Sequence, residues 1–316
     1  MTWFYNDNKN FVAFSECLQN MPNTVYTSMF VQVLLDLYWH STKKDILIKQ
    51  FLPFCALVIL SITSFVYSLS DTNKREENDE FSKWRRIVLA ALILIVWSYH
   101  VLLEVYQLKS NVCKYFKSVW NWNDMIALIL TFIVIAASLP EDPLISLEKL
   151  RPVASIASCA LMLKVFDWLR LFEQTAFYIK LMQETLKDIR AFLILILTAL
   201  ATFGIPMIIL NLNLDAESQV VDDVFGFWLV NMLLNQYLLA LGEFSMDNFA
   251  SNSQATLCYI FFICATFISQ VTMLNMLIAI MGDTFSKVIE NRTVNAIKSK
   301  LELMDELAAT MKQRDA

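Results

Sequence analysis

The chain has 316 residues, of which 57% are hydrophobic and 17% are charged, with a mean hydropathy of +0.50 and a formal net charge of −5 at pH 7. A soluble domain usually carries about 25% charged residues, so this composition excludes a large soluble core and indicates an integral membrane protein. The sequence offers no basic face for nucleic acid and no phosphate-binding loop, nucleophile elbow or metal-activated water site, which predicts a protein that is not an enzyme.

Apolar residues gather in six blocks near 20 residues long, the length that an α-helix needs to cross about 30 Å of hydrocarbon. Because lipid offers no partner for backbone polar groups, all six blocks are predicted to be transmembrane helices. The six blocks are Ile46–Leu69, Ile87–Leu108, Trp122–Leu139, Val153–Phe172, Ala191–Leu212 and Ala255–Gly282.

A shorter apolar stretch, Phe225–Leu241, lies between the fifth and sixth blocks and carries Asn231, Asn235 and Gln236. These polar residues predict a re-entrant helix that is buried in protein and does not face lipid.

Basic residues predict the direction of the spans, because cytosolic loops carry an excess of Lys and Arg. The segments before the first span and after the second, fourth and sixth spans are basic, and we expect them to be cytosolic. The loop Ser70–Arg86 disagrees, since it also carries basic residues.

Two further segments show helical spacing of apolar residues against a polar face. The first, Gln174–Asp188, is predicted to lie on the inner membrane surface. The second follows the sixth span, and we expect it to pack beneath the bundle in the cytosol. Its apolar residues are Ile297, Leu301, Met304, Ala308 and Met311.

The predicted fold is therefore an all-α integral membrane protein with six spans and a re-entrant helix. The expected divisions are a cytosolic segment (1–45), the first four spans (46–172), an interfacial linker helix (173–190), the last two spans with the re-entrant helix (191–284) and a cytosolic amphipathic helix (285–316).

The stretch from Ala191 to Ser286 contains no Lys, Arg or His. Its charged residues are all acidic: Asp215, Glu217, Asp222, Asp223, Glu243, Asp247 and Asp283. An apolar hairpin with only negative charge between its arms repels anions and concentrates cations, which predicts one subunit's share of a cation pore.

The sequence Leu241-Gly242-Glu243 ends the re-entrant stretch. Selectivity filters bring backbone carbonyls or rings of acids close to an axis, and Gly lets a backbone come close. A loop with one glycine and one acid is common by itself, but here it follows a half-helix in a stretch without basic residues. We therefore predict that Leu241, Gly242 and Glu243 form the filter, where Glu243 attracts cations and divalent cations most.

The end of the sixth span carries Asn275, Ile278 and Met281. A ring of large apolar side chains can close a pore by dewetting, so we predict a gate here. Asn275 is costly in such a helix unless it finds a partner or water. The alternative, in which Ile278 and Met281 only pack on neighbouring helices, stays open.

The segment Leu274–Phe285 closely resembles the end of the pore helix in the transient receptor potential (TRP) cation channel superfamily. Leu241–Glu243 is similar to that family's filter, and Leu34–Trp39 resembles the helix that the family places before the first span. The resemblance implies a homotetramer with a central pore. In each subunit it implies a peripheral four-helix bundle (46–172) and a pore module with a re-entrant pore helix (191–284). It also implies Gly242 and Glu243 in the filter and Asn275 just above a lower gate at Ile278.

The sequence departs from the family pattern at two places. The helix after Gly282 lacks the tryptophan of several subfamilies. The loop after the first span is short, whereas polycystin-like and mucolipin-like relatives carry a folded domain there, so the sequence argues against those two branches. The subfamily is left unassigned.

A metal site is predicted at the inner ends of the second and third spans. Its four donors, the bundle donor set, are Glu104, Gln107, Asn121 and Asp124. All four offer side-chain oxygens, which a hard cation such as Ca²⁺ prefers. Capping of the third helix by Asn121 and Asp124 is an alternative. The resemblance to the cytosolic calcium site of several TRP subfamilies favours regulatory Ca²⁺, while His100 is expected to line the bundle's interior.

The fourth span carries only Lys164, Asp167 and Arg170 as charged residues, too few for a strong voltage sensor. Basic residues near the inner leaflet could contact anionic headgroups, including those of phosphoinositides, although ordinary positive-inside flanking explains them equally well. These candidates are Arg170, Lys180, Lys187 and Arg190.

The sequence thus predicts a subunit of a tetrameric, non-selective cation channel that conducts Ca²⁺, Na⁺ and K⁺ in the plasma or ciliary membrane. A relative of voltage-gated channels would carry a regular train of Arg in the fourth span, which is missing. A secondary transporter would show related halves, and no second re-entrant stretch occurs in the first half. A non-conducting regulatory subunit remains possible.

Overall fold

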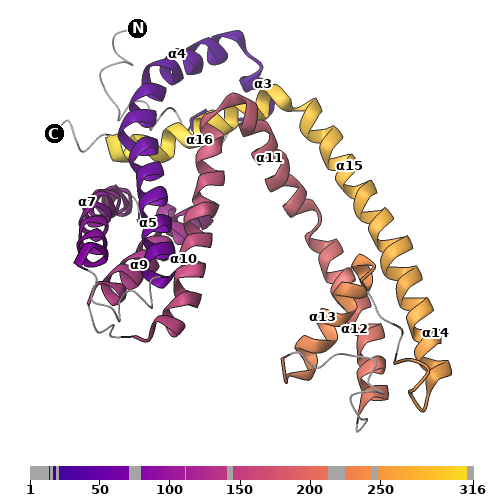
Figure 1. Ribbon diagram of the computed structural model, residues 1–316. Helices are drawn as coiled ribbons and strands as arrows, with labels where there is room; N and C mark the ends of the chain where they lie inside the picture. Colours follow the sequence, from indigo (N-terminus) through magenta and orange to yellow (C-terminus); the bar gives the residue numbers. More distant parts are fainter. Residues whose placement is uncertain are drawn as a thin grey trace. The chain divides into compact units, whose positions relative to one another are not determined.

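The computed structural model describes residues 14, 17–18, 21–70, 80–110, 112–140, 145–212, 225–243, 246 and 248–311. All regular structure in these residues is helical (Figure 1). The helices are α3 (Asn23–Tyr26), α4 (Met29–Ile46), η1 (Leu47–Phe51), α5 (Leu52–Ser70), α7 (Glu80–Ser110), α8 (Val112–Lys117), α9 (Val119–Ser138), α10 (Leu147–Trp168), η2 (Leu169–Leu171), α11 (Glu173–Asp188), α12 (Arg190–Asn211), α13 (Trp228–Leu241), α14 (Ala255–Thr266), η4 (Phe267–Met273), α15 (Leu274–Glu290) and α16 (Arg292–Met311).

Six helical segments of the described chain are long and apolar enough to cross a membrane, which confirms the predicted number of spans. They are Met29–Leu69, Lys83–Lys109, Val119–Ser138, Glu148–Leu171, Arg190–Asn211 and Ala255–Glu290. The shorter apolar helix Trp228–Leu241 lies between the last two along the chain. The predicted all-α fold class is therefore confirmed. It could be predicted because the length and hydropathy of a membrane span are read directly from the sequence.

The chain divides into two compact units. The first consists of Met1–Lys180 and Arg292–Ala316, and the second of Leu181–Asn291. The predicted five-part division is not tested by this separation and stays a prediction.

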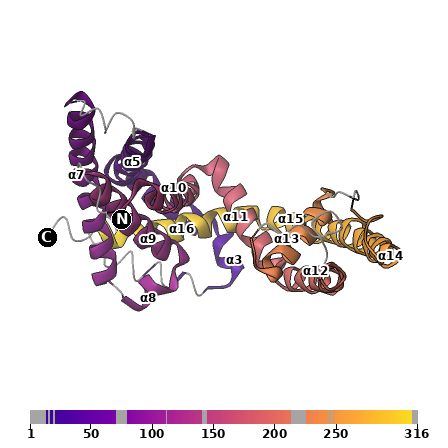
Figure 2. The same cartoon turned by 60° about the horizontal axis from the view of Figure 1, so that its bottom comes forward.

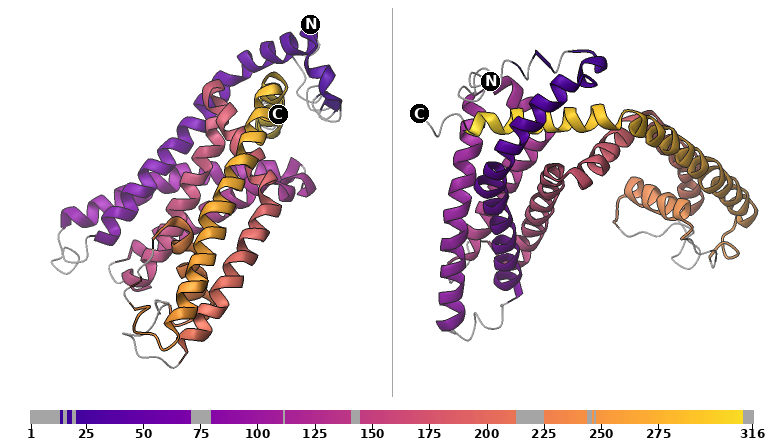
Figure 3. Two further views of the ribbon diagram at one scale, coloured as in Figure 1. Left: turned by 90° about the vertical axis from the view of Figure 1, so that its right-hand side faces the viewer. Right: turned by 90° about the horizontal axis from the view of Figure 1, so that it is seen from above.

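The first unit is a bundle of α5, α7, α9 and α10 (Figures 1 and 3). Helix α10 packs closely on α9 through the buried small residues Ala154, Ala157 and Ala160, which let two helix backbones approach. Asn123 Nδ2 on α9 donates to the Ala160 carbonyl of α10 at 3.0 Å. This close pairing brings the polar residues of α9 and α10 together inside the bundle.

Helix α16 packs on the first unit beside α3 and α4 (Figure 3). Leu301 and Met304 of α16 are buried, as the amphipathic pattern predicts. Lys300 Nζ lies 3.0 Å from Asp36 of α4, and Lys298 Nζ donates to Asn23 Oδ1 at 2.7 Å.

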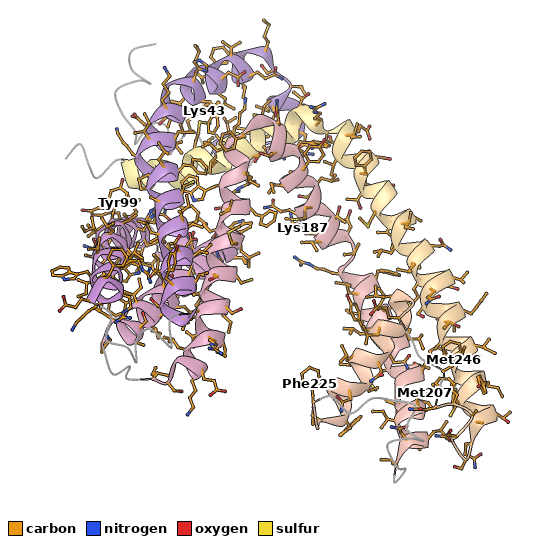
Figure 4. The ribbon with its side chains drawn as sticks, in the orientation of Figure 1. Lys43, Tyr99, Lys187, Met207, Phe225 and Met246 are labelled. Atoms are coloured by element: carbon orange, nitrogen blue, oxygen red, sulfur yellow. The ribbon has the colours of Figure 1, made fainter. Side chains whose placement is uncertain are left out.

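The second unit contains α12, α13, α14, η4 and α15, and Figure 2 shows α12 and α13 side by side. Met207 of α12 packs in a small core with Leu239, Phe249 and Phe262, and Figure 4 labels Met207 there. Packing between α12 and α13 leaves no room for a side chain at Gly204, since a Cβ there would lie 2.5 Å from Met232 Cγ.

The sixth-span helix continues past the predicted boundary at residue 285 and ends at Glu290. The helix contains no proline, and Gly282 does not interrupt it, so the amphipathic pattern continues through residue 285. The chain turns at Asn291, whose side chain donates to the Lys287 carbonyl at 3.1 Å. Likewise, α4, η1 and α5 run on through the predicted start of the first span at residue 46.

Candidate functional site

The backbone conformation of the predicted filter is set by the turn that ends α13. Gly242 adopts a left-handed conformation with φ 90° and ψ 7°. Its N–H donates to the Leu239 carbonyl at 3.0 Å, and the N–H of Glu243 donates to the Leu238 carbonyl at 2.9 Å. These two bonds form a Schellman motif, which usually needs glycine at the left-handed position. Gly242 therefore ends the helix and sets the direction of the backbone at the predicted filter.

Gln270 is a residue that the sequence argument missed. Its Nε2, on η4 of the sixth span, donates to the Leu239 carbonyl at 2.8 Å. The same carbonyl accepts the Gly242 N–H. The Gln270 side chain thus connects the end of α13 to the helix of the sixth span. A lone glutamine in an apolar span was the available signal, because a polar group there needs a partner.

The beginning of α13 is fixed by a buried polar side chain. Asn231 Oδ1 accepts the backbone N–H of Phe225 at 3.0 Å, and Asn231 is only 4% exposed. Phe225, labelled in Figure 4, therefore turns back on the first turns of α13. Asn231 and Asn235, two of the polar residues that suggested a re-entrant helix, are thus used in local hydrogen bonds.

Leu241, Gly242 and Glu243 are all exposed in the single chain. Of the seven acids in the stretch without basic residues, Glu243 and Asp283 lie within the described residues and the others lie outside them. Asp283 forms an exposed ion pair with Lys287 at 2.6 Å. Glu243 is consequently the described acid that stands just after the end of α13.

The predicted gate lies on a helix with an altered backbone. Residues Phe267–Met273 form a π-helix, with hydrogen bonds from residue i to residue i+5. Asn275 Nδ2 donates to the Val271 carbonyl at 2.6 Å. This bond gives the polar amide of Asn275 a partner within an apolar span.

Ile278 and Met281 are exposed in the single chain, Ile278 by 67% of its surface. With Leu274 and Phe285 they fall within an arc of roughly 60° on a helix of 3.6 residues per turn. Asn275 lies about 60° outside this arc. Ile278 and Met281 thus share one exposed helix side, whereas Asn275 points away from it.

A hydrogen bond joins the C-terminal end of α11 to the C-terminal half of α15. The hydroxyl of Thr284, which is 2% exposed, donates to Asp188 Oδ2 at 2.8 Å. Asp188 is the last residue of α11, where a negative charge is unfavourable for the helix dipole. The bond to Thr284 offsets that cost and links the linker helix to the predicted gate helix.

The bundle donor set converges as predicted. Glu104, Gln107, Asn121 and Asp124 all line one cavity of about 60 Å³ in the first unit, and His100 lines it too. The capping alternative does not match the structure, because α9 begins at Val119 and Asn121 Nδ2 donates to the Tyr115 carbonyl at 3.1 Å.

The same cavity holds a lysine that the metal prediction had left out. Lys164 Nζ on α10 lies 2.5 Å from Asp124 Oδ2 and 3.0 Å from Asp167 Oδ2. Asp167 also pairs with Arg170, three residues further along. Both carboxylates are buried, with Asp124 7% and Asp167 4% exposed.

Tyr115 fixes the remaining carboxylate of the cavity. Its hydroxyl donates to Glu104 Oε2 at 2.7 Å. Burial, together with the neighbouring negative charge of Glu104, raises the pKa of Tyr115 well above its ordinary value of 10. The hydroxyl therefore stays protonated and donating at neutral pH.

The candidate lipid contacts lie in different surroundings. Arg170 is buried, and Lys187, labelled in Figure 4, pairs with Glu184 at 3.0 Å, whereas Arg190 is exposed. Lys180 lines a second cavity of the first unit, about 210 Å³ in volume, which Arg170, Arg292 and Lys300 also line. The guanidinium of Arg292 stands 5.4 Å from the centre of the Phe177 ring.

Comparison with known proteins identifies relatives of this chain. The profile of the ion transport protein family matches residues 49–293. Polycystin-2-like protein 2 of Homo sapiens is 28% identical over 209 residues, which are 58% of this chain and 32% of the relative. The Mus musculus protein of the same name is 26% identical over 225 residues, or 64% of this chain and 34% of the relative. The chain therefore spans about a third of the length of these curated relatives.

The argument against a polycystin-like branch is wrong, because polycystin-2-like proteins are among the relatives that match. That argument treated a domain inserted between two spans as diagnostic. Loops accept insertions and deletions without altering the helices that they connect, so a short loop says little about the ancestry of the spans.

The family match covers the apolar helices of both units, including α13 and the predicted filter and gate. It agrees with the six candidate spans and with the expectation of a multi-pass membrane protein that is not an enzyme. This chain belongs to the ion transport protein family, and it is a multi-pass membrane protein.

Proposed function

We propose that this chain is one subunit of a tetrameric, polycystin-2-like channel that conducts Ca²⁺, Na⁺ and K⁺ without strong selectivity. The observation that carries this proposal is the end of α13. A Schellman motif at Gly242 presents Glu243, while Gln270 ties the same turn to the inner helix. This acid stands in a long stretch of chain without any basic residue, which favours cations.

Tetrameric assembly would place four copies of Glu243 around one axis, and rings of acidic side chains are a common basis of cation selectivity. The uncovered side of α15 with Ile278 and Met281 would line the same axis further along the pathway. Family membership supports a channel over a secondary transporter. The few charges of the fourth span, already engaged in ion pairs, support weak voltage dependence.

Anionic lipid is a proposed partner of the first unit. The cavity lined by Arg170, Lys180, Arg292 and Lys300 supports this proposal better than the predicted contact at Lys187, which pairs with Glu184 of its own helix. Phosphate oxygens of a phosphoinositide headgroup suit such a cluster of cationic groups.

Glu243→Gln tests the proposed filter. Reconstituted full-length channel is recorded in planar bilayers, and reversal potentials give the permeability of Ca²⁺ relative to Na⁺. We expect this ratio to fall severalfold in Glu243→Gln, because four charges leave the axis together. Glu290→Gln, an exposed acid at the end of α15, is the matched control and should leave the ratio unchanged. An unchanged ratio in Glu243→Gln would remove this residue from the filter.

A further inference from the structure

We propose that the ε-ammonium group of Lys164 is the resident cation of the bundle cavity and excludes Ca²⁺ from the bundle donor set. The inference concerns the first unit alone and does not rest on the proposed conduction pathway. It makes Lys164 the residue that determines whether this cavity accepts a metal ion.

The position of the ammonium group is the first argument. Lys164 Nζ lies 2.5 Å from Asp124 Oδ2, which is within the distance that separates a bound Ca²⁺ from its oxygen ligands. The two cations would therefore compete for the same oxygen atom of Asp124. The side chain of Lys164 is only 15% exposed, and its second partner Asp167 also faces the cavity. Both contacts keep the ammonium group inside the cavity.

Charge balance is the second argument. Among the described residues, the charged groups that face this network are the carboxylates of Glu104, Asp124 and Asp167 and the cations Lys164 and Arg170. The net charge of these five groups is −1. Binding of Ca²⁺ would change this net charge to +1, next to a buried ammonium group. Without Lys164, two negative charges would remain, which Ca²⁺ would neutralise.

The other donors are also engaged. Glu104 accepts the hydroxyl of Tyr115 at 2.7 Å, and Asn121 uses its amide nitrogen on the Tyr115 carbonyl at 3.1 Å. Tyr115 thereby orients two members of the donor set without any metal ion. Both residues line the cavity and carry side-chain oxygens, so a ligand set would become available once the ammonium group is removed.

Radiolabelled Ca²⁺ binding to purified full-length protein tests this inference. Glu243→Gln serves as the common background, so that binding at the proposed filter contributes little. We expect the protein with Lys164 to show no Ca²⁺ binding that depends on Asp124. Lys164→Gln should create one site per chain, with affinity raised roughly a hundredfold or more, since a unit charge a few ångströms away is lost.

Two variants complete the design. Lys164→Arg keeps the positive charge and should bind no more Ca²⁺ than the background protein, while Asp124→Asn added to Lys164→Gln should abolish the new site. Ca²⁺ binding to the protein with Lys164 that disappears in Asp124→Asn would overturn the inference. So would a folded Lys164→Gln protein without a new site. If Lys164→Gln does not fold, the comparison of the Lys164 protein with Asp124→Asn still decides, because that pair retains the ammonium group.

Discussion

At the scale of single residues, Gly242 shows how one backbone conformation shapes the turn at the proposed filter. From the sequence, Gly242 is predicted in the filter because glycine permits a close approach to an axis. In the structure, its left-handed φ and the two hydrogen bonds of the Schellman motif give the stronger reason. A Cβ would meet only ordinary contact with Gln270 at 3.5 Å, so conformation and not space restricts this position.

Gly242→Ala should therefore destabilise the turn by about 1–2 kcal/mol, the cost of a left-handed alanine. We expect a lower midpoint of thermal unfolding and a changed Ca²⁺ to Na⁺ permeability ratio, because the backbone after α13 shifts. Gly242→Asn should be milder, since asparagine adopts this conformation more readily. Gly282→Ala, in a helix with open space at its Cβ, is the control. Equal effects of Ala and Asn at 242 would contradict this explanation.

Polar contacts between distant residues were the part of the site that the sequence did not disclose. Lys164 and Asp124 are 40 positions apart, and Gln270 and Leu239 are 31 apart. Spacing along one helix predicts which residues share a face, but it does not say which face of another helix opposes them. The bundle donor set was predictable because its two halves lie on neighbouring spans joined by a short segment. The cation that pairs with Asp124 of this set is Lys164 of α10, and spacing along the second and third spans does not predict it.

At the scale of helices, the sequence predicted which segments are helical better than it predicted the residues at which each helix begins and ends. Each apolar block became a helix, because hydrophobic length decides this directly. Helix ends depend on turns and caps, so α15 continued to Glu290 and the turn fell at Asn291. The sequence did not predict the π-helical segment Phe267–Met273 within the sixth span.

The contact between Asp188 and Thr284 yields a prediction at the same scale. Thr284→Val keeps the shape of the side chain and removes the hydroxyl that Asp188 accepts. Each of Thr284→Val and Asp188→Asn should cost about 1 kcal/mol, the usual net value of a hydrogen bond. The double variant should cost little more than either single variant, because one interaction is lost in all three.

Thermal unfolding of reconstituted protein measures this double-mutant cycle. Ser286→Ala is the control, since that hydroxyl donates to the Gly282 carbonyl within its own helix. Strictly additive losses would show that Asp188 and Thr284 contribute independently and that α11 and α15 are not joined through this bond.

At the scale of the whole molecule, family membership rests on the match over residues 49–293, while assembly and selectivity are proposals. A single chain leaves Glu243 and the apolar side of α15 exposed, and these surfaces need a partner or water to explain them. Four chains around one axis would give Glu243 a wet passage and Ile278 a constriction. The same arrangement explains why the stretch from Ala191 to Ser286 contains acids and no bases.

The most direct test of this account is a cryo-electron microscopy map of the full-length protein in lipid nanodiscs. The account predicts four copies around one axis, with Gly242 and Glu243 at the narrowest outer part of the passage and Ile278 facing the same axis further along it. A particle that places Ile278 and Glu243 against lipid, away from any shared axis, would contradict the proposed pore.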